Sequence, residues 1–178
     1  NVLALLPGSE QPDEVVVINA HWDHLGTKKT TEGTVIYNGA VDNASGTAAV
    51  VELARWLSER AKTRPFKRSI LFAHFTAEET GMIGAQRFAQ QPPMPTRQQV
   101  ALLNIDGMNV NDGVDYILQY GEGVSELEHY LAAAAKARGR TVKPDPRPQA
   151  GLLYRSDHHA LAQAGVPGLM FMSLDDTD

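Results

Sequence analysis

The feature that most constrains the fold of this chain is a regular alternation of short apolar runs with helical patterns. Runs rich in valine, isoleucine and leucine predict strands at 2–6, 14–20, 69–75, 100–105, 116–120 and 166–173. Apolar residues at helical spacing, with start and stop signals, predict helices at 45–60, 81–90, 125–138 and 157–163. Such alternation predicts a three-layer α/β/α sandwich around a central, mainly parallel (mixed) sheet.

The segments between these elements are predicted loops within one domain. Residues 26–39 are polar, and residues 141–154 contain several prolines, yet strand and helix patterns continue beyond them. At 178 residues the chain is long enough for one domain with a sizeable core. It begins without methionine, directly in a strand-like run, so we expect residues 1–178 to be a single catalytic domain cut from a longer protein at both ends.

Composition excludes several classes of function. Apolar residues make up 43% of the chain, which is typical of a globular protein. The net charge of -5, without a lysine or arginine stripe, argues against a nucleic-acid partner. No apolar run approaches the roughly 20 residues that a membrane span requires. The absence of cysteine excludes disulfides and thiolate metal sites; it is compatible with export, and we expect a periplasmic or secreted protein.

Chemistry-bearing residues lie at the edges of the predicted elements. His21 ends a strand, and Asp23 follows two residues later, where it could accept the second imidazole N–H and orient the ring. Asp42 precedes a helix together with Asn43 and Ser45, which are more capping candidates than one helix needs. The Asp42 carboxylate is therefore a candidate to bridge two cations.

Glu78 and Glu79 form the most informative pair. Two adjacent acids at the end of a buried strand repel each other unless a cation lies nearby. One of them can bind a metal while the other acts as general base on a water. Asp106 follows another strand and adds a carboxylate, although Asp-Gly is also an ordinary turn. Because sites in such sheets lie beyond the carboxyl ends of the strands, we expect these acids to meet His21 there.

Other histidines and serines are interpreted as structural. His24, His74, His129 and His159 are assigned structural or solvent-exposed positions rather than ligand roles. The run Ser156-Asp157-His158 suggests a serine triad, but no G-x-S-x-G elbow accompanies it. Ser156 and Asp157 are therefore interpreted as a helix cap.

The motifs taken together resemble one family. They occur in the order Ala20-His21-x-Asp23, Asn38-Gly39-Ala40-x-Asp42-Asn43-Ala44-Ser45-Gly46, Thr76-x-Glu78-Glu79-x-Gly81, Asn104-Ile105-Asp106 and Ser156-Asp157-His158. This pattern resembles the di-zinc exopeptidases that include bacterial leucine aminopeptidases, glutamate carboxypeptidase II and glutaminyl cyclase. The match runs from Asn1 almost to Asp178.

The resemblance implies a zinc-exopeptidase-like fold and a zinc-dependent aminopeptidase. Its substrate would be a peptide with a free N-terminus, hydrolysed at the N-terminal peptide bond by a metal-activated water. In such a site Asp42 would bridge two zinc ions, and His21 and Asp106 would complete the ligands of one. Glu79 would hold the other ion. Glu78 would be the general base, and Asp23 would orient His21.

One ligand of the family pattern is missing. A second histidine usually follows the last strand and binds the ion that Glu79 holds, but no histidine follows His159 here. We therefore expect one tight zinc ion near His21, an empty or partly filled Glu79 position, and weak activity or none. Without that cation, either Glu78 or Glu79 should have a raised pKa.

Two alternatives remain open from the sequence. A glutaminyl cyclase-type acyltransferase uses one zinc ion on the same fold, and the complete two-metal pattern argues against it. A non-catalytic peptidase-like domain would have lost its metals, which the intact ligand residues argue against. Candidate residues for a substrate side-chain pocket are Met108, Tyr154 and Arg155.

Overall fold

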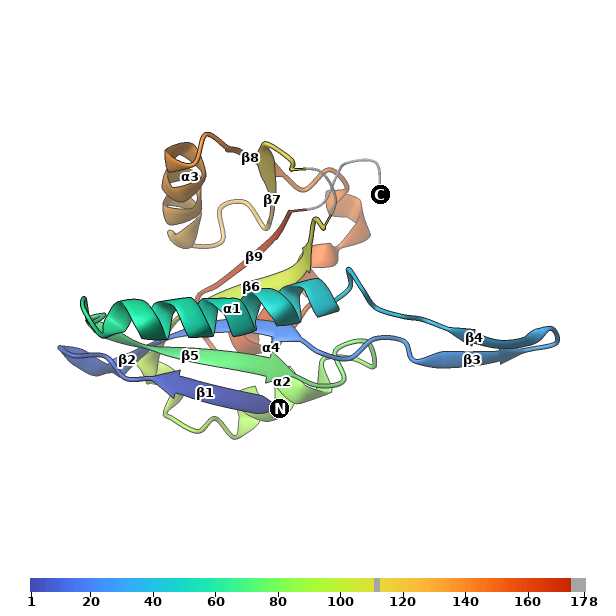
Figure 1. Cartoon of the computed structure of the whole chain (residues 1–178), viewed down its shortest axis with the longest axis horizontal. Helices are drawn as coiled ribbons and strands as arrows, with labels where there is room; N and C mark the ends of the chain where they lie inside the picture. The colour runs from blue at the N-terminus through green and yellow to red at the C-terminus, as the bar shows by residue number, and fades with distance from the viewer. Residues whose placement is uncertain (111–112, 174–178) are drawn as a thin grey trace.

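The centre of the molecule is a seven-stranded mixed sheet in the order β1-β5-β2-β6-β9-β7-β8 (Figure 1). The computed structural model describes residues 1–110 and 113–173. Its strands are β1 Val2–Leu6, β2 Gln11–His21, β5 Arg68–Phe75, β6 Gln99–Met108, β7 Tyr116–Tyr120, β8 Thr141–Pro144 and β9 Gly168–Ser173. The neighbours β5, β2, β6 and β9 run parallel, whereas β1 and β7 pair antiparallel with β5 and β9. The predicted mainly parallel, mixed sheet is confirmed.

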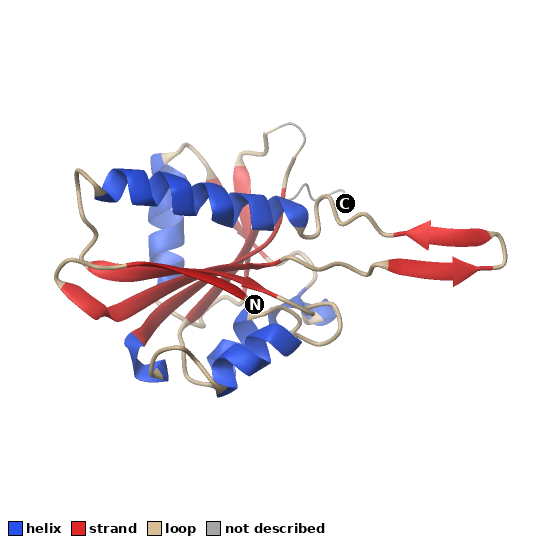
Figure 2. Ribbon diagram, turned by 60° about the horizontal axis from the view of Figure 1, so that its bottom comes forward, coloured by secondary structure: helices blue, strands red, loops and turns tan. Residues whose placement is uncertain are grey.

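Helices cover both faces of the sheet, as Figures 1 and 2 show. Helix α1 (Ala44–Ala61) lies on one face, and α2 (Ile83–Gln90) and α4 (His158–Gln163) lie on the other. Helix α3 (Leu127–Ala137) packs near β8 at the far end of the sheet. Short 3₁₀ turns occupy Thr96–Gln98, Pro148–Ala150 and Leu152–Tyr154. These layers form the α/β/α sandwich that the alternation of elements predicts.

The apolar runs in the parallel strands explain why both faces are covered. Successive strand residues point to opposite faces, so a run without polar interruptions needs a helix layer on each side. Val17 belongs to the core that includes residues of α2 and α4, whereas its neighbour Ile18 belongs to the core that includes Val50 of α1. Leu71 and Phe72 of β5 divide between the same two cores.

The start of α1 is fastened to the carboxyl end of β6. Asn43 is the N-cap, and its side-chain oxygen accepts hydrogen bonds from the backbone N–H of Gly46 at 3.0 Å and of Gly107 at 3.1 Å. Its side-chain amide donates to the Ile105 carbonyl at 3.0 Å. A Cβ at position 46 would stand 2.8 Å from that carbonyl oxygen, so only glycine allows this approach. Asn43 therefore caps the helix and leaves the Asp42 carboxylate for another role.

The segment predicted as a polar loop at 26–39 contains a hairpin instead. Strands β3 (Thr27–Thr30) and β4 (Gly33–Ile36) pair antiparallel and project away from the sheet (Figure 2). All of their residues are exposed, so the hairpin lacks the apolar alternation by which a half-buried strand is recognised. The predicted loop at 141–154 likewise contains β8 and two of the 3₁₀ turns.

Among the described residues, no helix combines the length and apolar character that crossing a bilayer requires.

Candidate metal centre

The carboxyl ends of three neighbouring parallel strands bring the predicted site residues together. His21 ends β2, Glu78 and Glu79 follow β5, and Asp106 lies near the end of β6. Asp42 reaches the same place from the turn before α1. This gathering agrees with the expectation that a site forms beyond the carboxyl ends of the strands.

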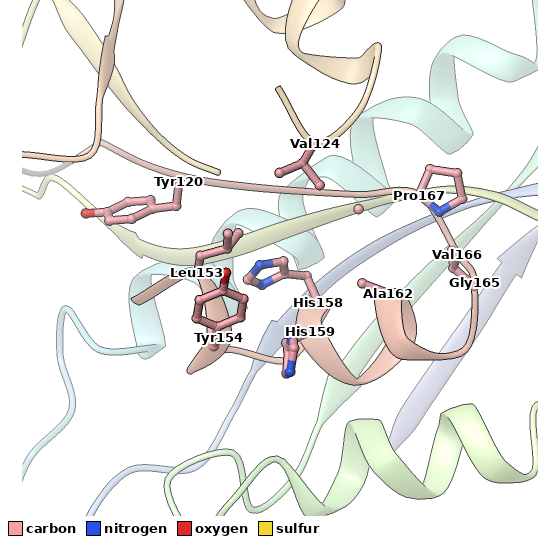
Figure 3. A pocket seen from close by; sticks show the side chains of 11 residues that line it. Tyr120, Val124, Leu153, Tyr154, His158, His159, Ala162, Gly165, Val166 and Pro167 are labelled. Carbon is pink, nitrogen blue, oxygen red and sulfur yellow. The ribbon is translucent and has the colours of Figure 1, made fainter. Parts of the chain in front are cut away.

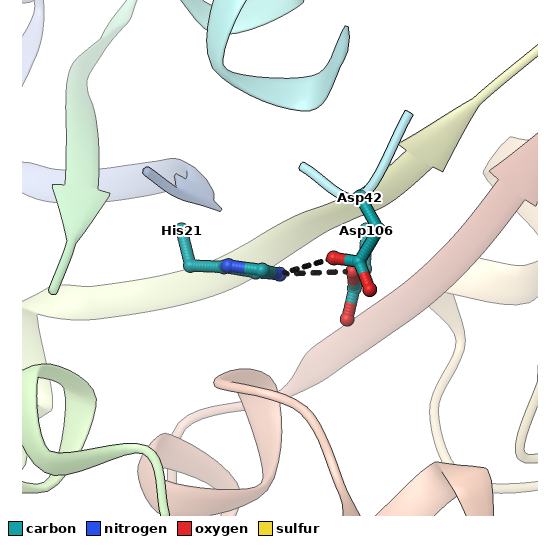
Figure 4. Close-up of side chains that lie close together, drawn as sticks. All are labelled: His21, Asp42 and Asp106. Atoms are coloured by element: carbon teal, nitrogen blue, oxygen red, sulfur yellow. Dashed lines mark hydrogen bonds and ion pairs between the residues drawn. The ribbon is translucent and has the colours of Figure 1, made fainter. Parts of the chain in front are cut away.

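His21, Asp42 and Asp106 form the first ligand group (Figure 4). The His21 Nε2 atom lies 3.2 Å from one oxygen of Asp42 and 3.2 Å from one oxygen of Asp106. The imidazole is buried, with 2% of its side chain exposed, whereas the Asp42 side chain is 55% exposed. A buried, strand-borne imidazole therefore faces two carboxylates at the mouth of the site.

The donor atoms of the first ligand group fit a zinc ion. Zinc takes imidazole nitrogen and carboxylate oxygen at about 2.0–2.2 Å, so tetrahedral neighbours stand roughly 3.3–3.6 Å apart. The two contacts of 3.2 Å from His21 are close to that spacing. Three protein ligands would leave the open position that a catalytic zinc site keeps.

Asp23 contacts both sides of the site, but not as the sequence suggests. The His21 Nδ1 atom lies 3.1 Å from the Asp23 backbone carbonyl oxygen and 3.9 Å from a carboxylate oxygen. A ring protonated at Nδ1 donates to that carbonyl and presents Nε2 to the ligand group. The Asp23 carboxylate instead accepts the backbone N–H groups of Glu78 at 3.1 Å and Glu79 at 3.3 Å. It fixes the turn that carries the two glutamates.

His24, Asp42 and Glu79 form a second ligand group, to which the sequence pattern does not assign His24. The His24 Nδ1 atom lies 2.6 Å from a Glu79 oxygen and 3.9 Å from the second oxygen of Asp42. The His24 and Glu79 side chains are 22% and 17% exposed. The available signal was the position of His24 directly after Asp23, which places it on the same loop as the predicted site residues.

The electrostatics of the site reflect its excess of acids. Burial raises the pKa of Glu78 to about 7, and the nearby charge of Asp106 adds to this effect. Burial lowers the pKa of His21, but its hydrogen bonds to Asp106 and Asp42 outweigh burial and raise the pKa to about 11. The hydrogen bond from His21 lowers the pKa of Asp42. Glu78 thus meets the expectation that one of the paired glutamates has a raised pKa.

The Ser156-Asp157-His158 run forms neither a triad nor a side-chain cap. The Asn104 side-chain amide donates to the Ser156 hydroxyl oxygen at 2.6 Å, inside the core. Asp157 occupies the N-cap position of α4 but makes no side-chain capping hydrogen bond, which corrects the interpretation as a cap. Asp157 is fully buried, and this burial raises its pKa. The charge of Glu78 raises the pKa of Asp157 further.

A cavity of about 510 Å³ lies beside α4 (Figure 3). Tyr154, one of the three predicted pocket residues, lines this cavity, whereas Met108 and Arg155 do not. The ring of His158 also lines it, and burial lowers the pKa of His158 to about 4, so the ring is neutral near neutral pH. No residue of the two ligand groups lines this cavity, which is therefore separate from the candidate metal centre.

Known proteins are similar to this chain in sequence. A probable zinc metalloprotease of Pyrenophora teres f. teres is 38% identical over 106 residues, which are 59% of this chain and 22% of that protein. Aminopeptidase NAALADL1 of Mus musculus is 36% identical over 110 residues, which are 60% of this chain and 13% of that protein. The chain thus spans less than a quarter of the length of these two relatives.

Structure and family comparisons agree with the sequence pattern. The structure of the Legionella pneumophila LapA aminopeptidase matches with a TM-score of 0.71 and 23% identity, covering 98% of this chain and 43% of that one. At this identity the match establishes the fold. The sequence model of peptidase family M28 matches residues 1–178. The chain therefore belongs to peptidase family M28.

Proposed function

We propose that residues 1–178 form the catalytic domain of a zinc-dependent aminopeptidase, which removes the N-terminal residue of a peptide. The observation that carries this proposal is the pair of ligand groups that share Asp42 beside the half-buried Glu78. Membership of a peptidase family supports a peptide substrate. The relatives named as a zinc metalloprotease and an aminopeptidase support zinc and the position of cleavage.

His21, Asp42 and Asp106 would hold one zinc ion, and Asp42 and Glu79 would contribute ligands to a second. When bound, zinc polarises a carbonyl and lowers the pKa of a bound water to about 7, so that hydroxide forms near neutral pH. The backbone carbonyl of Asp23 keeps the His21 ring in the orientation that this role requires.

Glu78 would move the proton in the reaction. Its carboxylate lies among the side chains of His21, Asp42 and Asp106, where it can reach a water held at the site. Glu78 would accept the proton of the attacking water and pass it to the nitrogen of the leaving peptide. The hydrogen bond from its backbone N–H to Asp23 keeps the Glu78 turn in place during both transfers.

A zinc site of this kind would favour substrates with a free α-amine. An unprotonated amine nitrogen has a lone pair, and zinc accepts nitrogen ligands. Acetylation delocalises that lone pair into an amide and adds bulk at the same position. The candidate centre would therefore favour cleavage next to a free N-terminus.

The two alternatives are less well supported. A glutaminyl cyclase-type acyltransferase needs one zinc ion, whereas the structure has two ligand groups. A non-catalytic domain has no need for two ligand groups with a further glutamate beside them. Hydrolysis accounts for more of the observed residues than either alternative.

Matched substrates test the proposal. Aminoacyl-anilides and short peptides are assayed with zinc-loaded protein, each in a free-amine and an N-acetylated form, and kcat/KM is measured. We expect cleavage of the free-amine forms and a loss of at least about 10²-fold on acetylation. Chelation should abolish the activity, and added zinc should restore it.

Two outcomes would contradict this proposal. Equal cleavage of both forms would indicate an endopeptidase or a carboxypeptidase-like enzyme. Cyclisation of peptides with N-terminal glutamine, without hydrolysis of any substrate, would favour the acyltransferase.

A further inference from the structure

We propose that three polar side chains at the start of α1, those of Asn43, Ser45 and Thr47, are positioning residues for the first ligand group. Each of them hydrogen-bonds to the backbone beside a ligand and so fixes the spacing of the ligands before a metal binds. The inference rests on the proposed function, because the first ligand group would hold the first zinc ion. It gives a role in metal binding to residues that belong to neither ligand group.

Asn43 holds the backbone on both sides of Asp106. Its side-chain amide donates to the Ile105 carbonyl oxygen at 3.0 Å, and its side-chain oxygen accepts from the Gly107 N–H at 3.1 Å. These two hydrogen bonds fix the peptide units that flank Asp106, and with them the direction in which its carboxylate leaves the strand. Because Asn43 directly follows Asp42, the same contacts tie the backbone of one ligand to that of the other.

Ser45 ties the turn that carries Asp42 to the end of β6. Its hydroxyl donates to the Val41 carbonyl oxygen at 2.5 Å and accepts from the Met108 N–H at 2.9 Å. Val41 directly precedes Asp42, and Met108 ends β6 two residues after Asp106. A single hydroxyl therefore connects the residue before one ligand with the strand end that carries another.

Thr47 holds the third ligand in the same way. Its hydroxyl donates to the backbone carbonyl oxygen of His21 at 2.9 Å, where β2 ends. The carbonyl oxygen of Thr47 itself lies 3.2 Å from Nε2 of His74, a residue of β5. This part of α1 is thus fixed against β5, and its hydroxyl fixes the backbone from which the His21 imidazole projects.

Helix capping does not account for these contacts. Polar side chains at a helix start commonly accept hydrogen bonds from the free N–H groups of the helix itself. Asn43 does so with Gly46, but the hydroxyls of Ser45 and Thr47 donate to carbonyl groups outside α1. Their hydrogen bonds join the helix to the elements that carry the ligands.

The exposure of Asp42 shows why the backbone has to be fixed. The His21 Nε2 atom lies 3.2 Å from an oxygen of Asp42, although the Asp42 side chain is 55% exposed. Packing around an exposed side chain does little to hold it, so its position depends on the turn that carries it. A preorganised ligand group binds a metal more tightly, because less ordering remains to be done when the metal arrives.

Zinc titration of variants tests this role without relying on catalysis. Each variant is made in Glu79→Gln protein, which lacks a carboxylate of the second group, so that the tightest ion reports on the first. Metal-free proteins are titrated with zinc by calorimetry against a competing chelator. Ser45→Ala and Thr47→Val should each weaken this ion by at least about 10-fold, whereas Thr47→Ser keeps the hydroxyl and should retain the affinity. Asn43→Ser keeps a good N-cap residue but is too short to hold both flanks of Asp106, so it should show a similar loss.

Ser69→Ala is the matched control for Ser45→Ala. The buried Ser69 hydroxyl also makes two hydrogen bonds to the backbone, donating to the Pro12 carbonyl oxygen at 2.7 Å and accepting from the Gly8 N–H at 2.9 Å. It lies at the amino end of β5, away from the ligand groups. Its loss should lower the melting temperature without changing the zinc affinity. Thr47→Val preserves the shape of the side chain, so it keeps the test decisive if circular dichroism shows that Ser45→Ala is unfolded.

The outcomes separate this inference from the proposed function. Unchanged zinc affinity in the Asn43, Ser45 and Thr47 variants would overturn the inference, and an unchanged affinity in one of them would remove that residue from the role. An equal loss in Ser69→Ala, or in Thr47→Ser, would also overturn it, because the effect would then reflect general stability. A Glu79→Gln protein that binds no zinc would contradict the proposed function itself.

Discussion

The two ligand groups share Asp42 but are built in different ways. In the first group His21 and Asp106 lie on strands of the sheet, and their side chains are 2% and 13% exposed. In the second group His24 and Glu79 lie on loops beyond the strands, and their side chains are 22% and 17% exposed. The sheet positions one group, whereas contacts between loops position the other.

The supporting contacts differ in the same way. The neighbouring strands β2 and β6 are joined by their backbone ladder and by a buried hydrogen bond of 2.6 Å from Asn19 to Asn104. The loop-borne group depends on the Asp23 carboxylate and on the close approach at Gly39. Strand-borne ligands are therefore more precisely held, and loop-borne ligands can adjust when a metal binds.

The largest effect is expected for Glu78→Gln, which tests whether catalysis at the two ligand groups requires Glu78. Glu78→Gln keeps the size and hydrogen-bonding atoms of the side chain but cannot accept the proton of the attacking water. In zinc-loaded protein kcat should fall by about 10²–10⁴-fold. Zinc stoichiometry by calorimetry should stay the same, because Glu78 belongs to neither group. Turnover close to that of the wild type would remove Glu78 from the mechanism.

A smaller effect separates the two groups from each other. Asp23→Asn leaves the backbone carbonyl that faces His21 but retains only one side-chain oxygen to accept the N–H groups of Glu78 and Glu79. Chelator competition should show about 10-fold weaker binding of the second zinc ion, with the first ion changed much less.

Glu32→Gln is the matched control for that variant, because it removes the same charge from the exposed end of the hairpin. It should leave both affinities unchanged. If Asp23→Asn weakens both ions equally, the two groups are not supported independently.

Much of the first ligand group could be predicted from the sequence. Val17 and Ile18 lie in an apolar run that marks a buried parallel strand, and such strands carry His21 and Asp106 to the same edge of the sheet. The surplus of capping residues around Asn43 indicated that Asp42 was free for another role, and the structure confirms Asn43 as the cap.

The second ligand group could not be predicted in the same way. The position of His24 depends on a close backbone approach at Gly39, and no periodic pattern encodes that contact. The destination of the Asp23 carboxylate depends on a turn about 55 residues away in sequence. The hairpin β3–β4 was missed because all of its residues are exposed. Long-range contacts between loops leave no local signal in the sequence.

The most direct test of the shared centre is zinc titration of Asp42→Ala. Asp42 is 55% exposed, and Asn43 caps α1, so this substitution should leave the fold intact. If Asp42 joins the two groups, both zinc affinities should fall by at least about 10²-fold relative to the wild type in the same calorimetric experiment. Loss of only one ion, or wild-type affinity for both, would contradict a two-metal centre shared through Asp42.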